Sequence, residues 1–269
     1  MGLILWGRKG MIRVVFNQKG GVGKSSIATN LAAISANEGN KTLLIDLDAQ
    51  CNSSQYLLGD ELPEDEGTIA QYFANSLRAS FKVDISDYIY DTELANLHII
   101  PASPELGELQ SRLESRHKIF KFRDLINILN EKYDRIYIDT PPAYNFYTLS
   151  ALIAADSVLI PFDCDDFSRK ALYTLMDNIE EVKEDHNENL KLDGIVVNQF
   201  QPRANQPNRV VNELRAEKLP LLDTYIGTSI KMRESHEAQL PLINFAPSHK
   251  LTKQFVELHR EIEKKSQTK

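Results

Sequence analysis

Residues 12–29 constrain the fold of this chain more than any other segment. An apolar run at 12–16 predicts a buried strand, a glycine-rich loop follows, and apolar residues at helical spacing predict a helix that opens at Ser25. In such a unit the backbone N–H groups of the loop and the helix dipole converge on one point. We therefore expect an anion site, with Lys24 reaching the β- and γ-phosphates of a nucleotide and the Ser25 hydroxyl binding Mg²⁺.

The loop departs from the most common phosphate-binding spacing. The pattern G-x-x-x-x-G-K-[ST] requires a glycine five residues before Gly23, where this chain has Gln18. The loop instead reads Lys-Gly-Gly-Val-Gly-Lys-Ser over 19–25, so that a second lysine, Lys19, stands at its start. A string of this length followed by an apolar helix is a specific signal for nucleotide binding.

Two further apolar runs end in carboxylates. The run at 41–47 leads into Asp46 and Asp48, and the run at 135–140 contains Asp139 near its end. Parallel α/β sheets bind ligands at the carboxyl ends of their strands, and side chains two residues apart on an extended chain point to the same side. Asp139 therefore stands where a Mg²⁺-binding acid is expected. Capping of the next helix is the alternative role for Asp46 and Asp48.

The remaining patterns alternate between strands and helices. Strands are predicted at 97–101, 157–162 and 192–198, and helices at 69–77, 168–183, 210–217 and 251–264. Asn198 ends its strand, either as a simple terminator or as a ligand contact. In the last helix a narrow apolar stripe predicts docking on the body of the protein, through Leu251, Phe255, Leu258 and Ile262. We expect one α/β domain over 1–269, with a doubly wound, mostly parallel twisted sheet, helices on both faces, and residues 1–10 as an extension outside the core.

Composition narrows the class of protein. No apolar run reaches the roughly 18 residues of a membrane span, so no integral membrane segment is expected. The two cysteines lie far apart, which argues against a disulfide framework, a zinc site or an iron–sulfur cluster and favours a reducing cytosol. The net charge of −7 argues against nucleic acid, but residues 200–269 carry more Lys and Arg than Asp and Glu.

Three motifs together resemble those of the ParA/MinD ATPases, which carry a deviant Walker A motif. They follow the order seen in ParA: Lys-Gly-Gly-Val-Gly-Lys-Ser at 19–25, Leu-Leu-Ile-Asp-Leu-Asp-Ala-Gln at 43–50, and Ile-Tyr-Ile-Asp-Thr-Pro-Pro at 136–142. The similarity covers nearly the whole chain from Met11. It implies a P-loop NTPase fold and slow hydrolysis of ATP.

The resemblance also implies a role for individual residues. Lys24 would bind phosphate, and Ser25, Asp46 and Asp139 would hold Mg²⁺. Lys19 would reach the phosphates of a partner subunit, Asp48 would position the attacking water, and Asn198 would contact adenine. The implied nucleotide-binding residues are Lys19, Gly20, Gly21, Val22, Gly23, Lys24, Ser25, Ser26 and Asn198.

Members of the ParA type bind nonspecific DNA as ATP dimers and release it after hydrolysis. The corresponding basic positions in this chain are Arg203, Lys231 and Arg233, although Gly227 and Thr228 replace the usual Pro-Arg pair and Cys51 replaces a common glycine. The implied partners are a second copy of the chain, nonspecific DNA, and a ParB-like or other cargo-adaptor protein that stimulates hydrolysis. The implied location is the cytoplasm, on the nucleoid.

Two other classes share this loop. A MinD-like membrane-surface ATPase needs a terminal amphipathic helix rich in bulky apolar residues, whereas residues 261–269 are charged and polar. A metabolic enzyme, such as an ATP-dependent carboxylase or a cluster-carrying reductase, needs a substrate site or cluster cysteines, and the sequence shows neither.

Overall fold

The computed structural model describes residues 10–63, 66–78, 84–164 and 166–267. Its centre is a seven-stranded sheet with the order β3-β4-β2-β5-β1-β6-β7. Among the strands of the described residues only β3 pairs antiparallel, with β4, and the other pairings are parallel. The strands are β1 (Met11–Val15), β2 (Thr42–Asp46), β3 (Tyr90–Asp91), β4 (Leu97–Ile100), β5 (Arg135–Asp139), β6 (Ser157–Asp163) and β7 (Lys191–Asn198).

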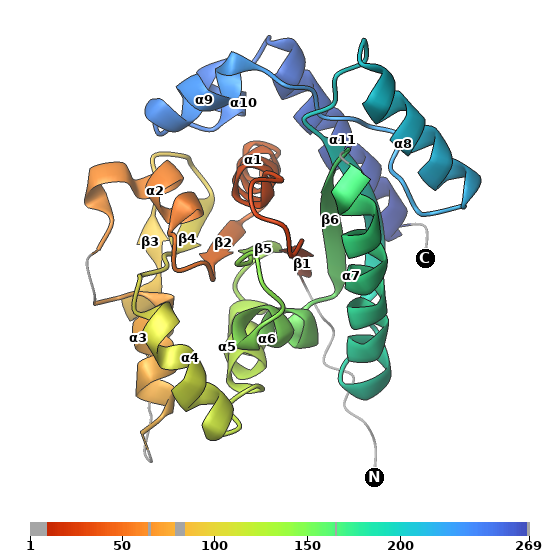
Figure 1. Cartoon of the computed structure of the whole chain (residues 1–269). Helices are drawn as coiled ribbons and strands as arrows, with labels where there is room; N and C mark the ends of the chain where they lie inside the picture. The colour runs from red at the N-terminus through yellow and green to blue at the C-terminus, as the bar shows by residue number, and fades with distance from the viewer. Residues whose placement is uncertain (1–9, 64–65, 79–83, 165, 268–269) are drawn as a thin grey trace.

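Helices cover both faces of this sheet (Figure 1). One face is covered by α1 (Lys24–Asn37), α2 (Asn52–Leu58), α9 (Ile230–Glu237), α10 (Leu242–Phe245) and α11 (Lys250–Gln267). The other face is covered by α3 (Ile69–Ser76), α4 (Leu106–Ser115), α5 (Lys121–Leu129), α6 (Phe146–Ala154) and α7 (Asp166–Asp185). The buried residues of α8 (Asn205–Ala216) join the same apolar cluster as those of α7.

Successive side chains of a strand point to opposite faces of the sheet, and here both faces are buried. Ile12 and Val14 of β1 join one apolar cluster, and Val15 joins the other. Parallel strands covered on both faces read as continuous apolar runs, which is the pattern that predicts them. The doubly wound α/β class is confirmed, and so is the docking of the last helix, because Leu251, Phe255, Leu258 and Ile262 are all buried. The predicted extension at 1–10 lies almost wholly outside the described residues.

The sequence patterns do not predict a charge cluster beneath α11. Arg13 of β1 is only 1% exposed, and its guanidinium contacts Asp193 at 2.6 Å and Glu263 at 3.0 Å. Arg135 contacts the same Glu263 at 2.7 Å. Burial alone lowers the pKa of Arg13, but the charges of Asp193 and Glu263 outweigh it, so that the pKa of Arg13 is raised. The cluster fixes the end of α11 to the sheet.

Replacing Arg13 should therefore destabilise the fold. We expect Arg13→Met to lower the free energy of unfolding by about 3 kcal/mol, because Asp193 is left buried without its cation. Urea denaturation measures this loss. The double replacement Arg13→Met with Asp193→Asn should recover part of it, since no unpaired buried charge remains. An equal or larger loss in the double variant would contradict this account.

Candidate functional site

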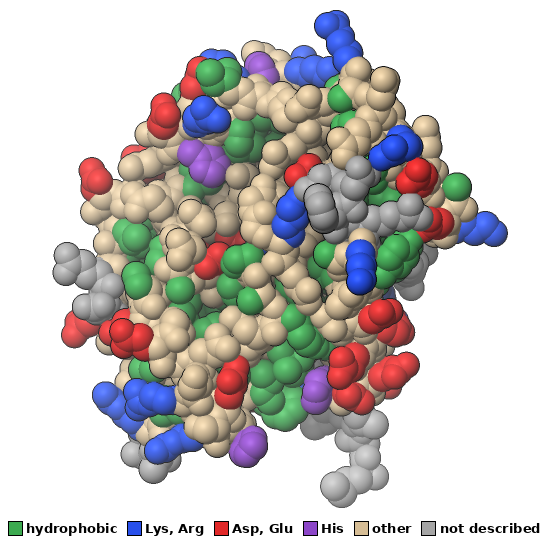
Figure 2. Space-filling view, in the orientation of Figure 1, with side chains coloured by type: hydrophobic (Ala, Val, Ile, Leu, Met, Phe, Trp, Pro, Cys, Tyr) green, Lys and Arg blue, Asp and Glu red, His purple; other side chains and the backbone are tan. Residues whose placement is uncertain are grey.

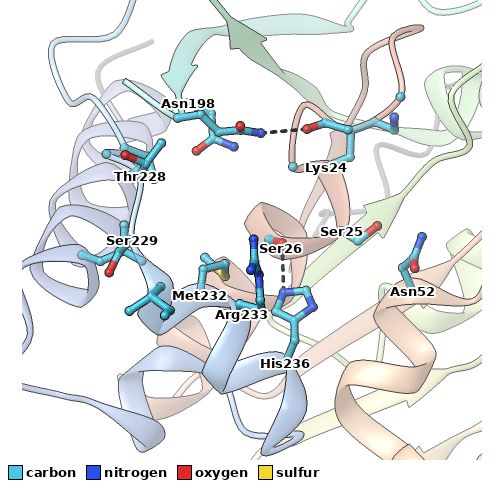
Figure 3. Close-up of a pocket in the computed structure, with 18 of the residues that line it drawn as sticks. Lys24, Ser25, Ser26, Asn52, Asn198, Thr228, Ser229, Met232, Arg233 and His236 are labelled. Carbon is cyan, nitrogen blue, oxygen red and sulfur yellow. Dashed lines mark hydrogen bonds between the residues drawn. The ribbon is translucent and has the colours of Figure 1, made fainter. Parts of the chain in front are cut away.

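Strands β1, β2 and β5 bring the predicted site residues to one edge of the sheet. Asp46 and Asp139 are paired in register across β2 and β5, and Val15, just before the glycine loop, pairs with Asp139. A cavity of about 1040 Å³ opens over this carboxyl edge (Figure 3). Its lining includes Gly20, Gly21, Gly23, Lys24, Ser25, Ser26, Asp48 and Asn198.

The glycine loop is shaped by backbone conformations that other residues rarely adopt. Gly21 and Gly23 have φ values of 76° and 87°, in the left-handed region. A Cβ atom on Gly23 would also collide with the Asn198 side chain. Asn198 Nδ2 donates a hydrogen bond of 2.8 Å to the carbonyl of Val22, which ties the end of β7 to the loop. The loop leads into α1 at Lys24, so that the amino end of this helix lies at the cavity that Lys24, Ser25 and Ser26 line.

The two lysines of the loop lie in different places. Lys24 lines the cavity and is 7% exposed, and its Nζ donates to the carbonyl of Lys19 at 3.1 Å. Burial lowers the pKa of Lys24, against the charges of Asp139 and Asp48. Lys19 is not among the cavity's lining residues in the described part of the chain, and its Nζ lies 3.4 Å from the Asp163 carboxylate at the end of β6. The structure thus places only one of the two ammonium groups in the cavity of its own subunit.

The carboxylates of Asp46 and Asp139 differ in their hydrogen bonds. Asp46 accepts from the N–H of Asp48 and from both the N–H and the hydroxyl of Ser54. Asp139 Oδ2 accepts from the Ser53 hydroxyl at 2.7 Å, whereas Asp139 Oδ1 is buried and has no hydrogen-bond partner in the part of the chain that the structure describes. Burial and the charge of Asp139 raise the pKa of Asp46, and burial raises the pKa of Asp139. A cation bound beside these two buried carboxylates would stabilise their ionised forms.

The residues present fit Mg²⁺. Asp139 offers a buried oxygen, Oδ1, that has no hydrogen-bond partner among the described residues. The Ser25 hydroxyl is near enough to lower the pKa of Asp139, against the larger effect of burial, and Ser25 lines the same cavity. Mg²⁺ prefers such hard oxygen ligands, few in number and completed by water and substrate phosphate. The described residues contain no cluster of three or more His, Cys, Asp or Glu side chains that could hold a metal by themselves.

Helix α9 contributes site residues that the sequence analysis does not assign to the nucleotide. Met232, Arg233 and His236 line the cavity opposite α1 (Figure 3), and His236 Nε2 lies 3.0 Å from the Ser26 hydroxyl. The one local signal for α9 is Ser229, whose hydroxyl accepts a hydrogen bond from the Lys231 N–H as an N-cap. Arg233, expected to contact DNA, thus lies in the main cavity.

The other two residues expected to contact DNA lie outside that cavity. Lys231 pairs with Glu234 at 2.6 Å on α9 itself. Arg203, between β7 and α8, lines a neighbouring cavity of about 640 Å³ together with His249 and Lys250. The space-filling view shows Lys and Arg side chains scattered among acidic ones on this side of the molecule (Figure 2).

No helix in the described ranges has the length and apolar character needed to cross a membrane.

Comparison with known proteins agrees with the geometry of the site. Residues 10–192 match a family described as AAA domain. The chain is 35% identical over 266 residues to the chromosome partitioning protein ParA of Myxococcus xanthus, covering 98% of this chain and 92% of that protein. It is 28% identical to the sporulation initiation inhibitor protein Soj of Bacillus subtilis, covering 94% of this chain and 98% of Soj.

A solved structure shows the same fold. The complex of a Cyanothece McdA variant with ATP superposes with a TM-score of 0.82 at 20% identity, covering 96% of this chain and 98% of that one. Together with the glycine loop and the acids that face it, these similarities show that the chain belongs to the ParA/MinD family of P-loop ATPases.

Proposed function

We propose that this chain is a Mg²⁺-dependent ATPase that forms an ATP-sandwich homodimer, binds nonspecific DNA, and uses partner-stimulated hydrolysis to partition or position a plasmid, a chromosome or a protein cargo. One observation carries the proposal: Lys24, Asp48 and the Ser25 hydroxyl face one cavity, while the second loop lysine is held outside it. The partitioning role is supported by similarity to a protein named chromosome partitioning protein ParA. We place its action in the cytoplasm, on the nucleoid.

Each side chain has a proposed part in ATP hydrolysis. The loop N–H groups and Lys24 bind the phosphates, and Asn198, fixed to the loop, contacts the base. Ser25 and Asp139 hold Mg²⁺, whose bound charge stabilises the negative charge that develops on the transferred phosphoryl group.

The two remaining acids act around the attacking water. Asp46 supports the cation site and fixes the backbone of Asp48 through its hydrogen bond with the Asp48 N–H. The Asp48 carboxylate, directed to the cavity, positions the attacking water.

The position of Lys19 supports the proposed dimer. One third of its side chain is exposed, and its ammonium group lies 3.4 Å from Asp163; among the described residues that line the cavity neither of the two appears. A second subunit facing this edge could receive Lys19 at its own γ-phosphate, since phosphoryl transfer gains most from positive charge at that point. The triphosphate would then hold two subunits together. Without a partner protein we propose that hydrolysis is slow.

DNA binding is proposed to use Arg203 and Lys231, which lie on the segments that follow β7 and flank the cavities. Cations of this kind contact phosphates without reading base sequence. A ParB-like or other cargo-adaptor protein would then release the dimer by stimulating hydrolysis. The alternative, a MinD-like membrane surface ATPase, gains no support from α11, because its apolar stripe is already buried against the body.

DNA retention across a salt series tests the proposal. We expect retention with ATP or a nonhydrolysable analogue and little with ADP. With two contacts per subunit, the slope of log affinity against log salt should be roughly −4 for a dimer. Lys231→Gln should lower its magnitude by about 2, and Lys183→Gln on α7, across the sheet, should leave it unchanged. Lipid binding with ATP but no DNA retention would reject the proposal in favour of the membrane alternative.

A further inference from the structure

Two side chains of α9 point into the nucleotide cavity. Arg233 and His236 are three residues apart and therefore lie on the same side of the helix. Both extend toward Ser26 from below in the close-up, beside Met232 (Figure 3). Lys231 is instead engaged with Glu234 on its own helix. The face of α9 that meets the cavity thus carries one guanidinium and one imidazole.

His236 is held in place by two other helices. Its Nε2 lies 3.0 Å from the Ser26 hydroxyl of α1, and its ring stacks on Tyr56 of α2 with centroids 4.0 Å apart and planes 25° apart. A second contact joins α9 to α2, since the Ser235 hydroxyl lies 2.7 Å from the Tyr56 hydroxyl. Burial lowers the pKa of His236, which favours the uncharged form of its imidazole. The helix that follows the phosphate loop, α1, is therefore in direct contact with α9.

Arg233 has a different environment. Its side chain is exposed to the cavity, and within the described residues no carboxylate forms an ion pair with it. Ser26, one residue beyond the proposed Mg²⁺ ligand Ser25, lies in the first turn of α1, where the N–H groups and the dipole attract anions. A guanidinium without a counterion, next to an anion-binding helix end, is complementary to phosphate.

We propose that Arg233 and His236 bind the phosphate chain of the nucleotide on the side of Ser26, and that this contact ties the position of α9 to nucleotide occupancy. The inference rests on the proposed ATP site and assigns Arg233 to the nucleotide rather than to DNA. Helix α9 also carries Lys231, which we propose contacts DNA. A nucleotide that binds Arg233 and His236 would therefore also determine the position of Lys231. We assign the contact to the phosphates that ADP and ATP share, because the γ-phosphate is the one proposed to meet Lys24 and the partner's Lys19.

Calorimetric titration with Mg-ADP and Mg-ATP tests the contact. We expect Arg233→Gln and His236→Gln each to weaken both nucleotides by about tenfold, the loss of one charge-assisted hydrogen bond. Arg209→Gln on α8 and His186→Gln beyond α7 remove the same groups from surfaces outside the cavity and should change affinity by less than about twofold. Failure of the unaltered protein to bind either nucleotide would reject the ATP site itself. Normal binding that Arg233→Gln leaves unchanged would overturn the inference alone.

Hydrogen exchange tests the link to α9. Mg-ADP should slow exchange at 230–237 and at 24–30 in the unaltered protein. In the double variant Arg233→Gln, His236→Gln, at saturating nucleotide, protection should persist at 24–30 and disappear at 230–237. If protection persists at both segments in the double variant, α9 responds to the nucleotide without these side chains, and the proposed link is overturned. Because Arg233 is exposed, its single variant keeps the test valid if the loss of His236 disturbs folding.

Discussion

Lys19→Ala is expected to abolish ATP-dependent dimers and to lower the rate of ATP hydrolysis by about 10³-fold or more, while the affinity of the monomer for ATP changes little. The expected loss of rate equals the effect of a cation that a second protein delivers to the transferred phosphate. Monomer affinity is spared because Lys24, not Lys19, lines the subunit's own cavity. Light scattering with a nonhydrolysable analogue measures the dimer, and phosphate release measures the rate.

Two other lysine variants serve as controls for this prediction. Lys24→Ala should remove ATP binding itself, because we propose that this buried ammonium group is the one that binds the phosphates. Lys132→Ala removes an exposed lysine just before β5, at the opposite edge of the sheet, and should leave the dimer intact. Dimers that persist in Lys19→Ala would mean that this ammonium group stays with Asp163 and takes no part in assembly.

The sequence predicts the strands and the phosphate loop well because their causes are local. A strand buried on both faces must be apolar along its length, as 12–16 and 135–140 are, and such runs are visible without knowledge of the partners. Gly23 is required by its own backbone angle and by the approach of Asn198. The approach of Asn198 is a tertiary contact that the sequence does not show. The positive φ is a local requirement of the loop, and it is the reason why a glycine at this position indicates a phosphate-binding loop.

Helix α9 and Arg13 could not be predicted because their causes lie elsewhere in the chain. Among the residues of α9 only Ser235 is buried, so no apolar periodicity marks the helix, and it is placed by contacts with Ser26 and Tyr56. Arg13 is a charge inside a strand that otherwise reads as core. Its partners, Asp193 and Glu263, are on β7 and α11, and no local pattern connects them. Contacts between distant segments decide both features.

Asp48→Ala is expected to leave an ATP dimer that forms but hydrolyses at least about 10²-fold more slowly, the usual effect of removing a group that positions or deprotonates a nucleophile. Gel filtration with ATP and a phosphate-release assay measure the two properties. Asp48→Asn is the matched variant, since it keeps the size of the side chain and the acceptor for the Gln50 N–H while removing the charge. A loss of the dimer in both variants would show that Asp48 serves assembly rather than hydrolysis.

Mixing the Asp48→Ala and Lys19→Ala proteins separates a lysine that acts across the dimer from one that acts within its own subunit. In a mixed dimer, the Lys19→Ala subunit keeps its own Asp48 and receives Lys19 from its partner, so one complete site is rebuilt. Each mixed dimer has one working site of two, so mixing should restore up to about a quarter of the unaltered rate when half of the subunits are in mixed dimers. If Lys19 served its own cavity, every site in the mixture would lack either the lysine or the acid, and the rate would stay at the level of the separate variants. Recovery on mixing can therefore arise only from a site shared by two subunits.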